Sequence, residues 1–437
     1  MTTDLAYEQQ TLWRNLHAPA TPVPFIECVE NLSCVTPHAG QLDVRALQED
    51  IAGIVRRHAV LQSRFPPQGS GAVRLTVPVP DNPVRVLDLR DLPEHEREQH
   101  AARVANTEVC EPFDITSGPL FRLALMTLDD ERHVLVFTAH HLVLDGPSGG
   151  IVWREIRASL EAPHAAVPQP SPPYGDYVRW QRQQLTGATL ARLRTFWLRK
   201  LDGLIDRRLG AAGPSDIQST RSKHARFTFC AEEIDALRQL SVRRRVSIAT
   251  TMLGLFMVVV HELTGSADVV VGVPVSCRPT DEFENTVGLF VNAVPIRSDL
   301  SGVSDAGDLL SRTWSAVLEA YQHRTFPYEF LVDALGARTG HGPPPFRVVF
   351  NFAFASKLAP ALPGLLADDI PAAREPPALA DMSLHIRDSG TSLDCCVLYK
   401  ADLFSASQIA DVTARLRRLA SDVARDPSRV ISRLVHS

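Results

Sequence analysis

The stretch Thr138-Ala139-His140-His141-Leu142-Val143-Leu144-Asp145-Gly146 places two histidines, an aspartate and a glycine at a fixed spacing. Residues 132–137 before it are mostly β-branched, aliphatic and aromatic, which predicts a buried strand. Successive side chains of a strand point to opposite faces. We therefore expect one of His140 and His141 to face the protein body and the other a cavity. Asp145 and the glycine after it predict a turn that the carboxylate braces.

The length and composition of the chain exclude several classes of protein. With 437 residues the chain is too long for one ordinary core, so we expect two domains or lobes. The net charge is −5 and no basic run stands out, so a nucleic-acid partner is not expected. The N-terminus is unlike a secretory signal, and the most apolar run, residues 248–260, is too short to span a bilayer. We predict no membrane partner and a cytoplasmic location.

The cysteines fit that location. Seven cysteines are scattered along the chain, and none form a C-x-x-C pair. An odd number without such spacing favours reduced, structural thiols over disulfides or a metal site.

Helical and strand patterns alternate through both halves, which predicts an α/β fold. Two strands, 123–126 and 132–137, are joined at Asp129-Asp130 as an antiparallel hairpin, and a helix is predicted over 151–160. Residues 162–173 hold five prolines and form the best linker candidate. We therefore predict an N-terminal domain, 1–173, and a C-terminal domain, 174–437.

Several further motifs occur in a particular order. They are Leu5 to Trp13, Arg57-His58 with Phe65, Tyr174 to Gln181, Val287 to Asn292, and Phe326 to Glu329. Together with the histidine stretch they resemble the condensation domains of nonribosomal peptide synthetases, in the chloramphenicol-acetyltransferase-like superfamily. The resemblance runs from about residue 5 to about residue 430.

This resemblance implies two chloramphenicol-acetyltransferase-like lobes in a V shape, with an active-site tunnel between them. A carrier protein delivers an acyl or aminoacyl thioester on its phosphopantetheine arm, and an amine or hydroxyl accepts it, giving an amide or ester. The acceptor is a small molecule or is itself carrier-bound. No cofactor is expected to stay bound. No adenylation or carrier segment is recognisable in the sequence, so we expect a freestanding enzyme that meets an acyl-loaded peptidyl carrier protein in trans.

The resemblance also implies roles for residues of the histidine stretch. His141 is expected to act on the proton of the nucleophile, because an imidazole titrates near neutral pH. The backbone N–H of Gly146 is placed to stabilise the intermediate, since a glycine turn allows close approach. His140 and Asp145 support the motif.

Two more residues come from the second half of the chain. Arg278 matches the family position that pairs with Asp145, and Asn292 is expected to line the tunnel. Pro147 stands where the family frequently has Trp, and the family's late motif rich in Arg and Asp is not recognisable near residues 342–345.

Alternative interpretations of the histidine stretch remain. The two histidines would also suit a buried pair that fills a strand end. A zinc site is a further option, but adjacent histidines on a strand point apart and chelate poorly, so no metal is expected.

Three other functions occur in the same superfamily. An acyl-CoA-dependent acyltransferase of the plant type would carry D-F-G-W-G, which is absent. An epimerisation domain usually has Trp-Phe-Thr where this chain has Leu289-Phe290-Val291. A non-catalytic recruitment module has an eroded histidine motif, whereas this one is intact.

Overall fold

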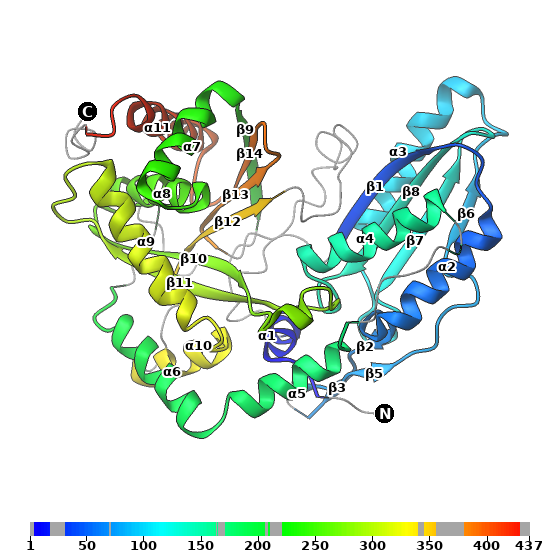
Figure 1. Cartoon of the computed structure of the whole chain (residues 1–437), viewed down its shortest axis with the longest axis horizontal. Helices are drawn as coiled ribbons and strands as arrows, with labels where there is room; N and C mark the ends of the chain where they lie inside the picture. The colour runs from blue at the N-terminus through cyan, green and yellow to red at the C-terminus, as the bar shows by residue number, and fades with distance from the viewer. Residues whose placement is uncertain are drawn as a thin grey trace.

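Two β-sheets divide the chain into two lobes, seen on the right and left of Figure 1. The computed structural model describes residues 4–17, 31–69, 71–162, 164, 171–205, 209, 221–339, 345–354 and 380–428. The predicted α/β fold is confirmed. Most of the predicted linker, and residues 342–344, lie outside the described residues, so the predicted domain boundary at residue 173 stays a prediction.

The N-terminal lobe holds a four-stranded sheet in the order β1-β8-β7-β6. Its strands are β1 (Asn31–Ala39), β6 (Arg85–Asp88), β7 (Phe121–Thr127) and β8 (Arg132–His140), and its helices are α2 (Val44–Arg57), α3 (Glu94–Cys110) and α4 (Gly146–Glu161). On β8, Leu135 and Phe137 pack in the cluster that includes α2 and α4, while Val136 packs in the cluster that includes α3. Both faces of β8 are therefore buried, which explains its apolar sequence.

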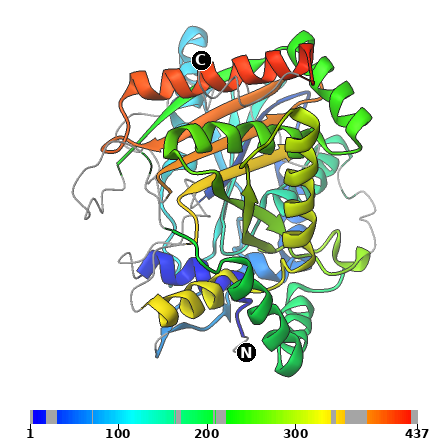
Figure 2. The same ribbon diagram turned by 90° about the vertical axis from the view of Figure 1, so that its left-hand side faces the viewer.

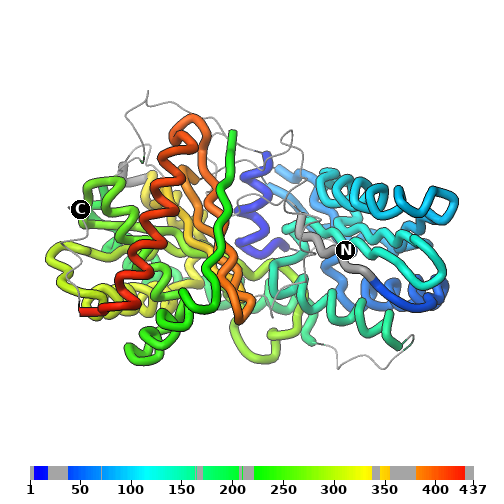
Figure 3. The backbone as a smooth tube through the Cα atoms, turned by 90° about the horizontal axis from the view of Figure 1, so that it is seen from above, coloured from blue at the N-terminus to red at the C-terminus, as the bar shows by residue number. Residues whose placement is uncertain are grey.

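The C-terminal lobe holds a six-stranded sheet in the order β11-β10-β12-β13-β14-β9. Its strands are β9 (Ser222–Phe229), β10 (Asp268–Ser276), β11 (Val291–Asp299), β12 (Val348–Phe354), β13 (Met382–Asp388) and β14 (Leu393–Lys400). Figures 2 and 3 show the helices of this lobe on the side of the sheet turned away from the N-terminal lobe. They are α7 (Ala231–Arg244), α8 (Ile248–Thr264), α9 (Ala306–Gln322) and α11 (Ala406–Arg425).

The apolar run of the sequence forms α8, and most of its side chains are buried in the core of the C-terminal lobe. Among the described residues, no single helix is long and apolar enough to cross a membrane. The bent pair α7 and α8 passes the same test of length and composition only when taken together.

Four helices, labelled in the lower part of Figure 1, connect the lobes. They are α1 (Tyr7–His17), α5 (Tyr174–Gln184), α6 (Gly187–Lys200) and α10 (Tyr328–Thr339). The remaining short elements are η1 (Ala59–Gln62), β2 (Ser63–Arg64), β3 (Pro67–Gln68), β4 (Gly71–Ala72), β5 (Leu75–Thr76) and η2 (Asp281–Phe283).

Each lobe buries side chains that come from the other part of the chain. Tyr7 of α1 lies in the large core cluster of the C-terminal lobe, with its ring centroid 4.8 Å from that of Phe330. In return, Leu289 and Phe290, which lie between β10 and β11, pack in the core cluster of the N-terminal lobe with Tyr177. The two cores therefore exchange segments rather than meeting at a simple surface.

We expect Gly288→Ala to disturb this exchange. A Cβ atom at Gly288 would lie 2.0 Å from the Tyr174 ring, so the ring or the backbone must move. Such overpacking should lower the free energy of unfolding by about 1–3 kcal/mol, measured by urea denaturation. As a control, Gly53→Ala in α2 meets nothing within 4 Å and should raise it by about 0.5–1 kcal/mol. An unchanged urea midpoint for Gly288→Ala would contradict the close packing.

Candidate active site

The histidine stretch forms a tight connection between β8 and α4. The strand ends at His140, and the helix begins at Gly146 because Asp145 is its N-cap: the carboxylate Oδ1 accepts the backbone N–H of Ser148 at 2.8 Å. The prediction that this helix starts at residue 151 is wrong, since the N-cap and a proline in the first turn extend it back to Gly146. Gly149 suits that turn, because a Cβ atom there would lie 3.2 Å from Leu144.

His140 is buried, with 1% of its surface exposed. Its Nδ1 accepts the backbone N–H of Leu142 at 3.0 Å, and its ring lies edge-on to Phe113. Burial, with a smaller contribution from the neighbouring His141, lowers the pKa of His140 to about 3. His140 is therefore a neutral hydrogen-bond acceptor that shapes the turn.

His141 lies in a different environment from His140, as predicted, although it belongs to the turn after β8 and not to the strand itself. Its side chain is only partly buried, and its Nδ1 lies 3.0 Å from the carbonyl oxygen of Leu144. A carbonyl oxygen only accepts, so Nδ1 must carry the proton, which leaves Nε2 with a free lone pair. Burial lowers the pKa of His141, although the charge of Asp145 and the Leu144 carbonyl oppose it. The ring is therefore neutral near pH 7 and held in the tautomer that suits a base.

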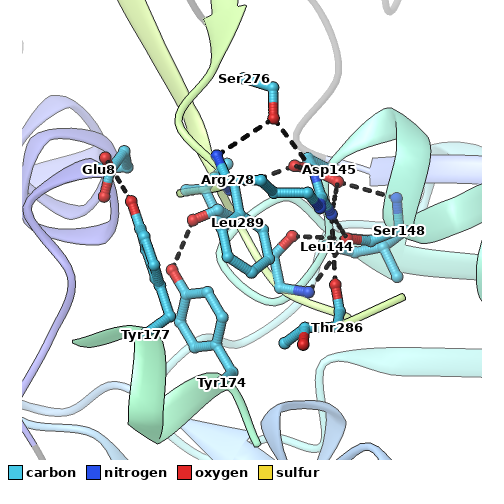
Figure 4. A network of polar contacts seen from close by, with 12 residues as sticks. Glu8, Leu144, Asp145, Ser148, Tyr174, Tyr177, Ser276, Arg278, Thr286 and Leu289 are labelled. Carbon is cyan, nitrogen blue, oxygen red and sulfur yellow. Dashed lines mark hydrogen bonds and ion pairs between the residues drawn. The ribbon is translucent and has the colours of Figure 1, made fainter. Parts of the chain in front are cut away.

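Asp145 and Arg278 form the predicted ion pair, shown in Figure 4. The Asp145 carboxylate is fully buried, and Arg278 reaches it with two N–H···O bonds of 2.9 and 3.1 Å. The backbone N–H of Phe290 donates to the same carboxylate at 3.2 Å, and the guanidinium lies 4.1 Å from the centroid of the Phe290 ring. Burial raises the pKa of Asp145, but the charge and hydrogen bonds of Arg278 outweigh it, so the net shift is downward. The pair joins the two lobes directly beside the histidines.

Ser148 completes this connection, and its only sign in the sequence is its place three residues after the cap. Its hydroxyl donates to the carbonyl oxygen of Gly288 at 2.9 Å. It accepts from the backbone N–H of Gly288 at 3.1 Å and from Arg278 at 2.7 Å. One donor and two acceptor positions are all that a hydroxyl has, so Ser148 is fully used as structure and is not available as a nucleophile.

The two other predicted site residues differ in their surroundings. Gly146 is partly exposed and is the first residue of α4, so its N–H has no partner within the helix. Asn292 is buried, and its amide donates to the carbonyl oxygens of Arg324 and Phe326 and accepts the N–H of Tyr328. These contacts give Asn292 the structural role of holding that turn, and its predicted place in the tunnel lining stays a prediction.

No group of three or more histidine, cysteine, aspartate or glutamate side chains is arranged to hold a metal ion in the part of the chain that the structure describes. The ring nitrogens that bond to Leu142 and Leu144 instead fix the two histidines as parts of the turn.

Comparison with known proteins identifies the family. The sequence profile described as the condensation domain matches residues 30–436. The chain belongs to the condensation-domain family. Among curated proteins, this condensation domain is 33% identical over 404 residues to chondramide synthase cmdD of Chondromyces crocatus, a match that covers 91% of the chain. It is 31% identical over 435 residues to the phosphinothricin tripeptide synthetase PhsC of Streptomyces viridochromogenes, covering 97% of the chain.

The condensation domain is much shorter than these relatives, spanning 10% of the length of the first and 39% of the second. Its fold is similar to a solved structure of almost the same extent, the condensation domain of the monacolin K polyketide synthase MokA. The TM-score is 0.82 at 19% identity, and the match covers 99% of both chains. The likeness confirms the predicted fold class.

The low pKa of His140 predicts how the stability of this condensation domain depends on pH. In the unfolded chain His140 takes up a proton below its ordinary pKa of 6.5, whereas in the folded chain it stays neutral down to about pH 3. His140 therefore makes the fold less stable as pH falls, by about 2 kcal/mol near pH 5. We expect His140→Gln to lose less stability than the wild type between about pH 7 and pH 5, measured by urea denaturation.

The control is His95→Gln in α3, at an exposed position, which should keep the wild-type pH dependence. Parallel stability curves for His140→Gln and the wild type would show that His140 is not the group responsible.

Proposed function

We propose that this condensation domain transfers an acyl or aminoacyl group from the phosphopantetheine thioester of a carrier protein to an amine or hydroxyl. The product is an amide or an ester of a natural-product pathway. The single observation that carries the proposal is the geometry of His141: a partly exposed imidazole whose Nδ1 donates to the Leu144 carbonyl oxygen, with no partner for Nε2 among the described residues. Membership of the family supports the reaction class, and this geometry supports His141 as the base.

The proposed reaction follows from these groups. The acceptor's N–H or O–H donates to Nε2 of His141 while its lone pair attacks the thioester carbonyl carbon. Negative charge then develops on the carbonyl oxygen, where the N–H of Gly146 at the start of α4 offers a donor and a positive helix end. Collapse of the intermediate breaks the C–S bond. The leaving thiolate recovers the proton from His141, so the enzyme returns to its starting state without an acyl-enzyme intermediate.

The ion pair serves this chemistry indirectly. Asp145 fixes the first turn of α4 and so the position of Gly146, and Arg278 fixes Asp145 from the other lobe. The negative charge of Asp145 also raises the pKa of His141, opposing the effect of burial. A more basic imidazole accepts the acceptor's proton more readily.

We propose that the donor is recognised on its carrier protein. The resemblance to segments of long synthases and synthetases supports a tethered donor. The test compares kcat/KM for the same acyl group on a carrier protein, on CoA and on a short thiol, with mass spectrometry of the product. We expect the carrier-bound donor to be clearly preferred. Equal kcat/KM for all three donors would contradict this and favour an acyl-CoA-dependent acyltransferase.

We expect His141→Ala to lose about 10²–10⁴-fold in kcat, since a positioned base typically contributes that much. The loss should be larger with an alcohol acceptor than with an amine that is already neutral. The thermal midpoint should stay near the wild-type value, because the ring is partly exposed. Wild-type turnover by His141→Ala with both acceptors would exclude the role of base. The control is His95→Ala, which removes a histidine at an exposed position in α3 and should keep wild-type kcat.

A further inference from the structure

Helix α1 contacts the catalytic turn through one buried side chain, Gln9. We propose that Gln9 is a positioning residue for His141, acting through the backbone of Leu142. The inference rests on the proposed function, because it assigns to Gln9 the task of holding the base in place. The opening motif of the sequence, in which Gln9 lies, has no role in the reaction as proposed above.

The amide of Gln9 is held at both ends. The residue is completely buried, and its Nε2 donates to the carbonyl oxygen of Leu142 at 2.7 Å. Its Oε1 accepts the backbone N–H of Ala6 at 3.2 Å, one of the N–H groups at the start of α1 that have no partner within the helix. Because Oε1 faces a donor, the NH₂ group must face Leu142, so the amide has one orientation.

Gln9 holds the residue that follows the catalytic base. The N–H of Leu142 donates to His140, and its carbonyl oxygen accepts from Gln9. The turn is closed by the N–H of Asp145, which donates to the carbonyl oxygen of Gly288 at 3.0 Å. His141 has its own Nδ1 bound to the Leu144 carbonyl oxygen inside this turn. Of these contacts, the Gln9 bond is the one that comes from α1. Without it the peptide of Leu142 could rotate, and the imidazole of the preceding His141 would shift with it.

Helix α1 is itself fixed by both lobes, so it is a rigid support for Gln9. On the side of α5, the Glu8 carboxylate accepts from Tyr177 and from Gln181, and Figure 4 shows Tyr177 turned toward Glu8. On the side of the C-terminal lobe, Arg14 forms an ion pair with Glu329 of α10. The position of the catalytic turn therefore depends on contacts that α1 makes with α5 and α10.

The first test compares two isosteric substitutions in α1. Gln9→Met keeps the volume but removes the donor to Leu142 and the acceptor for the Ala6 N–H, whereas Thr11→Val removes only a local bond to the Tyr7 carbonyl oxygen from a position that is also buried. We expect Gln9→Met to lower kcat at least about tenfold with little change in KM for the donor, since small misplacements of a catalytic group are costly. Thr11→Val should keep wild-type kcat. Equal kcat for the two variants would overturn the proposal.

The second test uses Gln9→Glu, which separates positioning from folding. A protonated carboxyl group can donate to the Leu142 carbonyl oxygen, but an ionised one cannot. The kcat of Gln9→Glu relative to the wild type should therefore fall as pH rises through the pKa of the new carboxyl group, at temperatures where both proteins are folded. A ratio that does not change with pH would contradict the proposal.

A third readout does not depend on turnover. In ¹⁵N-histidine-labelled protein, with the His141 signals assigned by their loss in His141→Ala, the wild type should show a single tautomer protonated on Nδ1. Gln9→Met should show a mixture of tautomers, and a wild-type spectrum would overturn the role of Gln9. Failure of the wild type to use any carrier-bound donor would instead contradict the proposed function and leave this readout to decide on Gln9.

Discussion

The arrangement of the site depends on the buried ion pair between Asp145 and Arg278. Removing both charges from water is unfavourable, and the pair is tolerated because two N–H···O bonds, the N–H of Phe290 and the N–H of Ser148 satisfy the carboxylate. Such a pair adds little net stability, but loss of one partner strands the other charge at a cost of about 3–5 kcal/mol. The ion pair instead fixes geometry, because it holds the start of α4 in one position relative to the segment after β10.

The ion pair also explains why the two histidines differ in their surroundings. The cap at Asp145 sets where α4 begins, and this sets the length of the turn that starts at His140. A turn this short buries the imidazole of His140 and leaves that of His141 partly exposed. Desolvation keeps both rings neutral, but only His141 combines neutrality with access. Identical residue types thus differ in chemistry because one is the last residue of a strand and the other is the first residue of the turn.

Local features of the site could be predicted from the sequence, whereas a long-range contact was predicted only where the family resemblance supplied it, as in the pairing of Asp145 with Arg278. The different surroundings of the two histidines were expected from strand alternation, but β8 ends at His140 and His141 belongs to the turn that follows. The predicted start of the helix at residue 151 was wrong because the N-cap at Asp145 begins α4 at Gly146, and Gly149 inside its first turns packs closely on Leu144. The partners of Ser148 and Gln9 lie more than a hundred residues away along the chain, and periodicity carries no information about them.

The exchange of segments between the two cores has a consequence for cooperativity. A fragment that ends at residue 173 would lack Tyr177, Leu289 and Phe290, all of which fill the core of the N-terminal lobe. A fragment that begins at residue 174 would lack Tyr7, which fills the other core. Each half alone would expose apolar surface and leave buried polar groups without partners, so we expect the two lobes to unfold together. Recombination between related proteins is accordingly constrained to exchange the whole pair of lobes, since a junction between them would mismatch both interiors.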